Sequence, residues 1–511
     1  MDKDFDIIVV GSGHNGLVAA NYLGAANYSV LLTERRPIMG GACITEELFP
    51  GYKFSACSYI CYLLQDKIID DLQLRDHGFD IYPINPSRFQ PFPNGSRILL
   101  WDDVQKTQEE IARHSKRDAK RFPEWLTFWE KAANIIGPYY LSNPPTVKQI
   151  INSLTDSEKD FFQRLLAVSM SDLLCEYFES ETMRAVYSQA QDVGDLNTPG
   201  SAWCYAHVKS SVLHRPENVG LVHGGMGGIT QAMAKSARSR GVSIETSTEV
   251  SRILVEDSRA IGVELVDGTQ YRSRVVVSNL DPKRTFLKLL PAEAINANFT
   301  ARINSLKTKA AYLKFHAALS DIPDFSAYFD NDFDSRYLAE IKICPSMEYF
   351  QNSWKDACNG RPSRTPVMEV QIPSVYDPTM APEGHHVMSI WVSYAPVTLA
   401  QSTWDEQRNK VGEHLIDELA TYAPNLRDIL VDWSLFTPLD LERRVGLTDG
   451  NIRHLDIIPS QFFANRPLAN WAHYRTPIDG LYLCGAGTHP GGEVTGAPGH
   501  NAAVTVLQDL Q

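Results

Sequence analysis

A glycine-rich loop near the N-terminus constrains this chain more than any other feature of its sequence. The loop is Gly11-Ser12-Gly13-His14-Asn15-Gly16, and the apolar, β-branched run from Phe5 to Val10 before it predicts a buried parallel strand. Residues 15–26 are rich in Ala and Leu and predict a helix, and residues 29–34 predict a second strand. Strand, loop, helix and strand together predict a βαβ unit of about 30 residues.

The residue types in this loop suit a bound dinucleotide. Gly11 permits the tight turn out of the strand, Gly13 lets the backbone approach a pyrophosphate, and Gly16 lets the helix pack closely on the strand. The helix N-terminus, with His14 and Asn15, offers free N–H groups and a positive dipole end to the phosphates. Glu34 ends the second strand, where an acidic side chain accepts hydrogen bonds from ribose hydroxyls and disfavours the 2′-phosphate of NADP.

Two further segments favour FAD over NAD. Arg35 follows the second strand, and the glycine pair Gly40-Gly41 before Ala42 would bring the chain back across the cofactor, where side chains would collide with it. Near the C-terminus, residues 481–503 read as a strand, a flat glycine turn and a helix that begins in small residues. The start of that helix could stabilise negative charge on a reduced flavin.

These segments resemble the FAD-dependent amine oxidase superfamily, and more closely its phytoene desaturase-like branch. The matching motifs are Gly11–Leu17, Gly40–Ala42, His223–Gly228, Gly450–His454 and Tyr474–Gly492. Within that branch the sequence is similar both to carotenoid desaturases, ketolases and isomerases and to the pyridine-nucleotide-disulfide oxidoreductase-domain type 2 proteins. The resemblance implies that Glu34 holds the adenosine ribose and that Val250 contacts the adenine side through its backbone. It places Gly485, Ala486, Gly496 and Ala497 near the isoalloxazine.

The resemblance also implies an α/β fold with two interleaved domains. We expect a discontinuous Rossmann-like FAD-binding domain formed by residues 1–71, 211–290 and 440–511. Residues 72–210 and 291–439 are expected to form a substrate-binding domain with a mixed sheet and a helical part. Residues 72–210 are helical and aromatic in character, and alternating strands such as Val387–Val392 occur after residue 310. The turn Asp267-Gly268 predicts a hairpin between strands at 260–265 and 271–278.

Candidates for a catalytic role are few, because the hard step of flavin chemistry belongs to the cofactor. His489 lies in the C-terminal glycine turn and could act as a general acid or base, although it could equally hold the turn together. His223, which precedes the Gly224–Gly228 run, and Glu493 are the other two candidates. Arg475 is expected to form a structural salt bridge. Lys314 lies on a strand where amine oxidases can carry a lysine that faces the flavin.

The composition and charge of the chain limit the kinds of molecule that it can bind. The chain has 511 residues, 43% of them hydrophobic, and a net charge of −13, which argues against nucleic acid because phosphate binding needs a basic face. No window approaches 18 uncharged apolar residues, and the N-terminus lacks the pattern of a signal peptide. We expect a cytoplasmic protein, with peripheral membrane contact and the oligomeric state left open. Cys57 and Cys61 lack a second pair of ligands at zinc spacing, so no metal site is predicted.

Three functions remain open from the sequence. The first is an oxidoreductase that desaturates, oxygenates or isomerises a hydrophobic, carotenoid- or isoprenoid-like substrate, with an apolar tunnel to the flavin. The second is an oxidase of amines or other polar molecules, with an aromatic cage or a carboxylate near the flavin. The third is a flavin-stabilised scaffold without catalysis. The chain has no second glycine fingerprint for a nicotinamide, so electrons would leave to oxygen, a quinone or another carrier.

Overall fold

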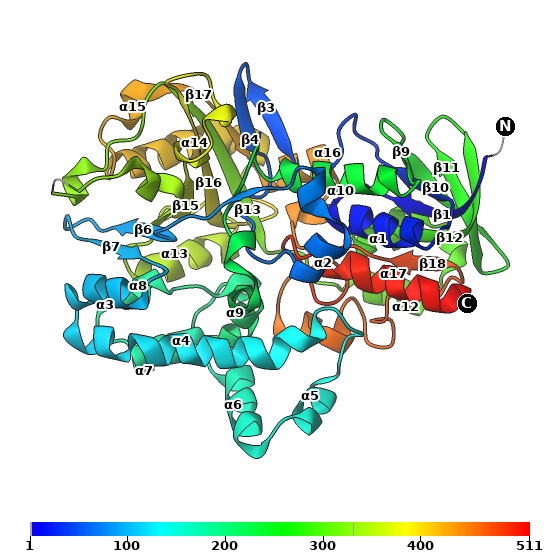
Figure 1. Cartoon of the computed structure of the whole chain (residues 1–511), viewed down its shortest axis with the longest axis horizontal. Helices are drawn as coiled ribbons and strands as arrows, with labels where there is room; N and C mark the ends of the chain where they lie inside the picture. The colour runs from blue at the N-terminus through cyan, green and yellow to red at the C-terminus, as the bar shows by residue number, and fades with distance from the viewer. Residues whose placement is uncertain (1–2, 331) are drawn as a thin grey trace.

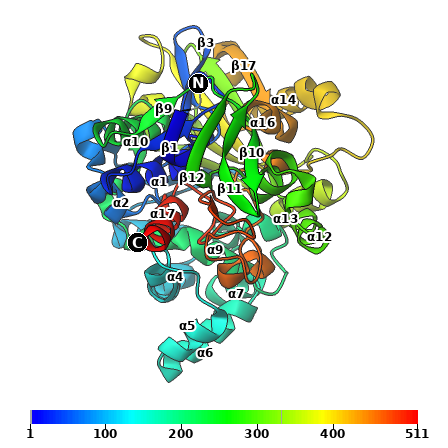
Figure 2. The same ribbon diagram turned by 90° about the vertical axis from the view of Figure 1, so that its right-hand side faces the viewer.

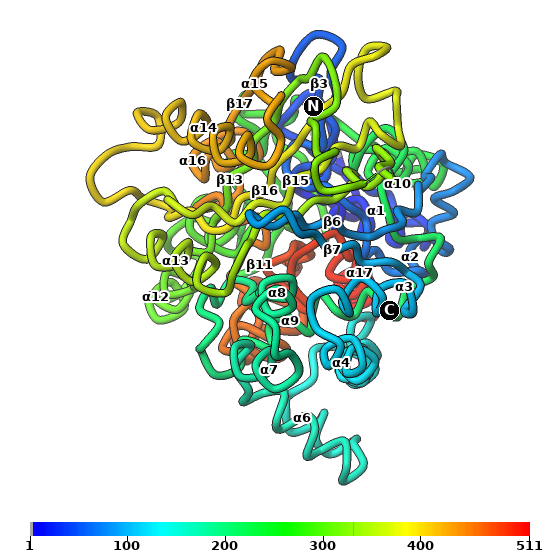
Figure 3. Tube along the Cα trace, turned by 90° about the vertical axis from the view of Figure 1, so that its left-hand side faces the viewer, coloured from blue at the N-terminus to red at the C-terminus, as the bar shows by residue number. Residues whose placement is uncertain are grey.

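The computed structural model describes residues 3–330 and 332–511 (Figure 1). Two sheets, each of seven strands within this described part of the chain, form the two halves of the molecule. One sheet lies beside helices α1, α10 and α17, and the other beside α13 and α14 (Figure 1). A group of helices, α3 to α9, occupies the lower left and centre of that view, and α6 extends farthest from the body (Figure 3).

The first sheet grows around the glycine-loop unit, with the strand order β10-β11-β12-β1-β2-β9 and with β18 beside β12. β1 pairs in parallel with β2 and β12, so its backbone is bonded on both edges. Figure 2 faces this sheet. Its strands are β1 Lys3–Val10, β2 Val30–Thr33, β9 Ser243–Glu245, β10 Val250–Glu256, β11 Arg259–Leu265, β12 Gln270–Ser278 and β18 Leu481–Leu483.

Both faces of β1 are buried, which explains its continuous apolar run. Ile7 and Val9 point into a core shared with the helices α1 His14–Ala25, α10 Gly227–Ser239 and α17 Ala497–Leu510. Ile8 and Val10 point into a second core formed with β10, β11 and the helix α12 Ala297–Asn304. The predicted strand, helix and hairpin of this region are therefore present, with ends shifted by no more than two residues.

The second sheet has the order β17-β13-β16-β15-β14-β6-β7. It has a core on each face, one with the helix α14 Trp404–Ala420 and the other with the helical group. Its strands are β6 Arg88–Pro91, β7 Arg97–Leu100, β13 Ala311–Leu319, β14 Ile341–Ile343, β15 Val367–Gln371, β16 His386–Ala395 and β17 Leu430–Phe436. Two small two-stranded sheets pair β3 Thr45–Phe49 with β4 Tyr52–Ser55, and β5 Ile81–Tyr82 with β8 Leu221–Val222.

The helical group packs mostly through aromatic side chains, among them Trp125, Trp129 and Phe178. Its helices are α3 Val104–Ala112, α4 Lys116–Ile136, α5 Val147–Ser153, α6 Asp156–Ala167, α7 Met170–Tyr177, α8 Glu181–Val186 and α9 Ser201–Lys209. The remaining helices are α2 Asp66–Asp71, α11 Pro282–Arg284, α13 Met347–Cys358, α15 Leu426–Ile429 and α16 Pro438–Val445. No helix in the described chain has the length and apolarity needed to cross a membrane.

The structure departs from two expectations about local structure. Residues 72–210 contain the helices α3 to α9, as expected, but β5, β6 and β7 also lie in this segment, and β6 and β7 join the second sheet beside β14. The alternating pattern expected for 387–392 is absent, since β16 is buried on both faces between the two cores. The first sheet draws its strands from 1–71, 211–290 and 440–511, and the domain boundaries themselves stay a prediction.

Candidate functional site

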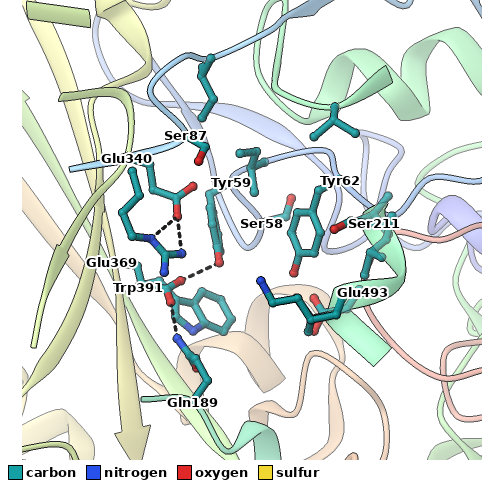
Figure 4. Close-up of a pocket in the computed structure, with 18 of the residues that line it drawn as sticks. Ser58, Tyr59, Tyr62, Ser87, Gln189, Ser211, Glu340, Glu369, Trp391 and Glu493 are labelled. Atoms are coloured by element: carbon teal, nitrogen blue, oxygen red, sulfur yellow. Dashed lines mark hydrogen bonds and ion pairs between the residues drawn. The ribbon is translucent and has the colours of Figure 1, made fainter. Parts of the chain in front are cut away.

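A cavity of about 700 Å³ lies where the two sheets and the helical group meet. One side of it is formed by His14, Ala42, Ser58 and Tyr62, next to the glycine loop, and by Glu493 of the C-terminal turn. The opposite side is formed by Glu340, Glu369 and Trp391 of the second sheet, as Figure 4 shows. The cavity thus connects the predicted cofactor-binding region with the predicted substrate domain.

The glycine loop has the close packing that its sequence predicts. Gly11 has φ +96°, a left-handed conformation that glycine adopts without strain. A Cβ on Gly16 would lie 2.2 Å from the Gly11 carbonyl oxygen, and one on Gly13 would lie 2.6 Å from Asn279 Nδ2. A side chain at position 16 would collide with the backbone of the loop, and one at position 13 would have to displace the Asn279 side chain. A loop of this kind before a helix presents backbone N–H groups to a ligand.

Glu34 and the glycine pair both pack against this loop. The Glu34 carboxylate accepts hydrogen bonds from Ser12 N at 3.1 Å, Ser12 Oγ at 2.7 Å and Arg36 N at 2.9 Å. Gly40 pairs with Gly13, and a Cβ on Gly41 would lie 3.1 Å from the Gly13 Cα. The pair therefore returns the chain to the glycine loop, where the sequence predicts that the cofactor phosphates bind.

Two residues of the predicted cofactor set make contacts at the edge of this region. The Arg35 side chain donates to the carbonyl oxygens of Arg443 and Arg444 at the end of α16, at 3.2 and 2.8 Å. Val250 begins β10, directly after a turn in which Thr248 N donates to the Glu34 carbonyl oxygen at 2.8 Å. The backbone at Val250 is thereby held near the end of β2.

The C-terminal segment packs against the glycine loop and the start of α1. Gly496, with φ +71°, precedes α17, whose first residue is Ala497. A Cβ on Gly499 would lie 2.2 Å from the Asn15 carbonyl oxygen, so α17 and α1 approach closely (Figure 1). Arg466, fully buried, donates to the Ala486 carbonyl oxygen at 2.8 Å and to that of Thr488 at 3.2 Å, which fixes the turn around Gly485.

Of the three predicted catalytic candidates, only Glu493 lines the cavity. His489 is buried, and its Nε2 is 2.7 Å from the Tyr139 carbonyl oxygen; burial lowers its pKa to about 4, so the ring is neutral at pH 7. His223 is exposed and packs against the Tyr82 ring at 5.6 Å. Arg475 forms the expected salt bridge, to Asp509 at 2.6 Å.

Glu493 belongs to a buried ionic junction that the sequence did not predict. Arg453 Nε donates to Glu493 at 2.7 Å, while Arg453 Nη1 donates to Asp192 and to the Tyr312 hydroxyl, both at 2.8 Å. The Tyr312 hydroxyl in turn donates to Asp192 at 2.6 Å. The junction joins the C-terminal turn to the helical group and to β13, so it fixes the cavity wall where three parts of the chain meet.

Lys314 is the most unusual buried group near the cavity. Its side chain is fully buried on β13, and its Nζ has no hydrogen-bond partner within the described residues. The Nζ lies 5.3 Å from the centre of the Tyr59 ring, and Trp391 stands opposite Lys314 across the strand pair. Burial lowers the pKa of Lys314 to about 7, because the charged form loses its hydration.

The cavity residues that sequence reasoning missed carry one common signal. Arg88, Glu340 and Glu369 all line the cavity from within or beside short apolar strands. A charged residue inside an apolar strand costs free energy unless it is paired or functional, so the pattern Val-Met-Glu-Val around Glu369 could have marked it. The partners of these charges come from distant segments, which no local pattern reveals.

The residues around the glycine loop fit FAD. Three buried polar atoms without a partner in the described chain lie at this loop or at the C-terminal turn beside it, namely His14 Nε2, Asn15 Oδ1 and His454 Nδ1. Unpaired buried polar groups are costly, and a cofactor with many donors and acceptors would satisfy them. The glycines of the loop leave room for the phosphates of the cofactor.

All eight cysteines, including the buried Cys57 and Cys61, are free thiols.

Comparison with known proteins agrees with this assignment. Residues 16–311 match the family model described as flavin containing amine oxidoreductase. The pyridine nucleotide-disulfide oxidoreductase domain-containing protein 2 of Rattus norvegicus is 35% identical, over 100% of this chain and 94% of that protein. One of the subunits of the limonene dehydrogenase of Castellaniella defragrans is 28% identical, over 99% of this chain and 95% of that protein.

A solved structure of a putrescine oxidase triple mutant has the same fold. It matches 100% of this chain and 99% of its own with a TM-score of 0.64 at 13% sequence identity. The resemblance to the amine oxidase superfamily, the α/β fold class and the FAD cofactor predicted from the sequence are thereby confirmed. The chain belongs to the flavin containing amine oxidoreductase family, and the protein is an FAD-dependent oxidoreductase.

Proposed function

We propose that the protein oxidises a largely hydrophobic, isoprenoid-like substrate by hydride transfer to its flavin. The apolar part of the cavity lining carries this proposal. It includes the partly exposed Leu126 and Val212, and we call this part the outer cavity. Its side chains are Ile60, Leu63, Ile84, Leu100, Trp101, Phe122, Leu126, Val208 and Val212. A cavity of about 700 Å³ with such a lining suits an extended apolar molecule, and the similarity to a limonene dehydrogenase supports the same substrate class.

The residues of the chain would bind and orient this substrate and exclude water. Bound FAD would supply the hydride-accepting chemistry. The Arg453 junction holds the Glu493 turn against Tyr312, so the wall next to the predicted flavin edge stays rigid. Oxygen, a quinone or another carrier would then accept the electrons.

Anaerobic stopped-flow measurement of flavin absorbance tests this function. Apolar terpenes and polyenes should bleach the flavin of the holoenzyme, because they fit the outer cavity. Rapid bleaching by small polar amines alone would favour the amine oxidase alternative, for which Glu369 and the rings of Tyr59 and Trp391 provide a carboxylate and aromatic walls. If no compound bleaches the flavin, the catalytic proposal fails in favour of a scaffold.

We also propose peripheral membrane contact at the cavity entrance. Leu126 and Val212 line the cavity yet are 37% and 53% exposed, so apolar side chains surround the entrance. The double variant Leu126→Asp, Val212→Asp should sediment less with phosphatidylcholine liposomes than the wild type, because charges at the entrance resist burial in lipid. Val266→Asp, on the exposed turn between β11 and β12, is the matched control and should sediment as the wild type does. Equal sedimentation of all three proteins would contradict the proposal.

A further inference from the structure

One wall of the cavity is polar although most of the lining is apolar. This wall comes from the second sheet, the segment after α8 and the Tyr59 side chain, and it faces the side that carries Tyr62 and Glu493 (Figure 4). Its polar side chains are Tyr59, Arg88, Gln189, Glu340 and Glu369. Burying charges is costly, and a purely hydrocarbon substrate would form no favourable contact with them.

Glu369 is the carboxylate of this wall that has no cation of its own. It accepts hydrogen bonds from the Tyr59 hydroxyl at 2.7 Å and from Gln189 Nε2 at 3.0 Å, and both donors are neutral. Glu340, by contrast, accepts Nη2 and Nε of Arg88 at 2.8 and 3.3 Å. An ionised carboxylate has about four lone-pair sites, so Glu369 can accept further hydrogen bonds from the cavity.

Two lysines lie in the same cross-strand row as Glu369. Strand register places Lys342, Glu369, Trp391 and Lys314 in one row across β14, β15, β16 and β13. The Nζ of Lys342 is buried and donates to the carbonyl oxygens of Ala185, Val186 and Ser188, at 3.3, 2.9 and 3.0 Å. Lys314 lies beyond the Trp391 ring. No ion pair to Glu369 occurs in the part of the chain that the structure describes, although both lysines contribute positive potential nearby.

Aromatic rings enclose the position in front of Glu369. The Trp391 ring centre is 6.0 Å from that of Tyr59 and 4.7 Å from that of Tyr312. The contact of Lys342 with the end of α8 fixes the segment that carries Gln189, and Gln189 and Tyr59 together hold the Glu369 carboxylate in one orientation. The result is a preorganised acceptor with aromatic sides, which suits a donor group and repels an anion.

We propose that this polar wall is a subsite for a hydrogen-bond-donating end group of the substrate, a protonated amine or a hydroxyl. The end group would bind at Glu369, remote from the bond that is oxidised on the Glu493 side of the cavity. The substrate is then amphipathic, with an apolar body in the outer cavity and one donor group on the second sheet. This inference rests on the proposed function for the apolar body, but the subsite itself concerns binding alone.

Equilibrium binding to the oxidised holoenzyme tests the subsite without turnover. The probes are dodecylamine, 1-dodecanol and dodecanoate below their micellar concentrations, under anaerobic conditions, and the signals are the flavin difference spectrum and tryptophan fluorescence. We expect the amine, the alcohol or both to bind about tenfold or more tightly than dodecanoate, the factor that one hydrogen bond to a charged group is worth. The amine alone would assign the subsite to a cation, and equal binding of amine and alcohol would assign it to a neutral donor.

Glu369→Gln should remove this preference, because the amide keeps the shape but loses the charge and one acceptor. Glu348→Gln makes the same change on the exposed face of α13 and should keep the preference of the wild type. The inference is overturned if dodecanoate binds as tightly as the other two probes, or if Glu369→Gln retains the order. The order of the three probe affinities in the wild type tests the inference even if the variant does not fold. These affinities do not depend on flavin reduction, so a failure of the proposed function would leave them unchanged.

Discussion

Replacing Lys314 by Met should slow anaerobic reduction of the flavin by about 10²-fold or more, because a positioned proton-transfer group contributes roughly 10²–10⁴-fold. Lys314 Nζ is fully buried beside the cavity residues Tyr59 and Trp391 and has no partner within the described chain. A buried amine in this state needs a partner from bound cofactor, substrate or water. The measurement is the stopped-flow bleaching rate with a saturating reducing substrate. Lys410→Met, on an exposed part of α14, is the control and should react at the wild-type rate.

The effect of Lys314→Met on the free energy of unfolding should depend on pH. The folded pKa of Lys314 is about 7, below the unfolded value, so the folded protein binds fewer protons between about pH 7 and pH 10.4. Lys314 therefore destabilises the fold fully below pH 7, and this penalty decreases as the pH rises. We expect the stability advantage of Lys314→Met to shrink by up to about 1.4 kcal/mol per pH unit across that window. The role proposed for Lys314 would be contradicted if the variant reduces its flavin at the wild-type rate and if its difference in free energy of unfolding from the wild type does not change with pH.

Replacing Arg453 by Met should destabilise the holoenzyme by about 3–5 kcal/mol, the usual cost of removing one partner from a buried ion pair. The variant leaves the buried carboxylate of Asp192 and the Glu493 carboxylate of the cavity wall without their shared guanidinium. Because the junction ties the C-terminal turn to β13 and to the helical group, flavin should be released at a lower temperature. The rise of flavin fluorescence on heating measures this release.

A second substitution separates charge from packing at this junction. Asp192→Asn combined with Arg453→Met removes one of the two unpaired charges, so part of the stability should return. Arg475→Met is the matched control, since Arg475 forms its salt bridge with Asp509 near the surface, and surface pairs are worth about 0–1 kcal/mol. If Arg453→Met is no less stable than Arg475→Met, the junction does not hold the site together.

Most of the cofactor-binding half could be predicted from the sequence. Each glycine in the loop has a backbone or packing requirement within a short stretch, such as the 2.2 Å approach between a Gly16 Cβ and Gly11 O. Such requirements leave a residue signature that can be read without the fold. The second sheet was harder, because β6 and β7 are short strands inside a helical segment and their pairing with β14 is not local.

The position of the candidate catalytic residues relative to the cavity was also difficult to predict from the sequence. His489 and His223 were chosen for their position in glycine turns, but the structure gives them contacts outside the cavity lining. Glu493 was chosen from the same segment and does line it. A turn residue points inward or outward by a rotation of one or two backbone angles, which spacing alone does not encode.

The glycine loop and the acidic residue after the second strand could be predicted because they lie within about 30 residues of each other, and FAD because each of its motifs is a short local pattern. The side chains that meet in the cavity could not be predicted in this way. Arg453 meets Asp192, Tyr312 and Glu493, and Glu369 meets Tyr59 and Gln189, through strand register and helix packing that bring distant segments together. The physical reason is that a glycine requirement is local to the backbone, whereas the partner of a buried charge is set by the whole fold.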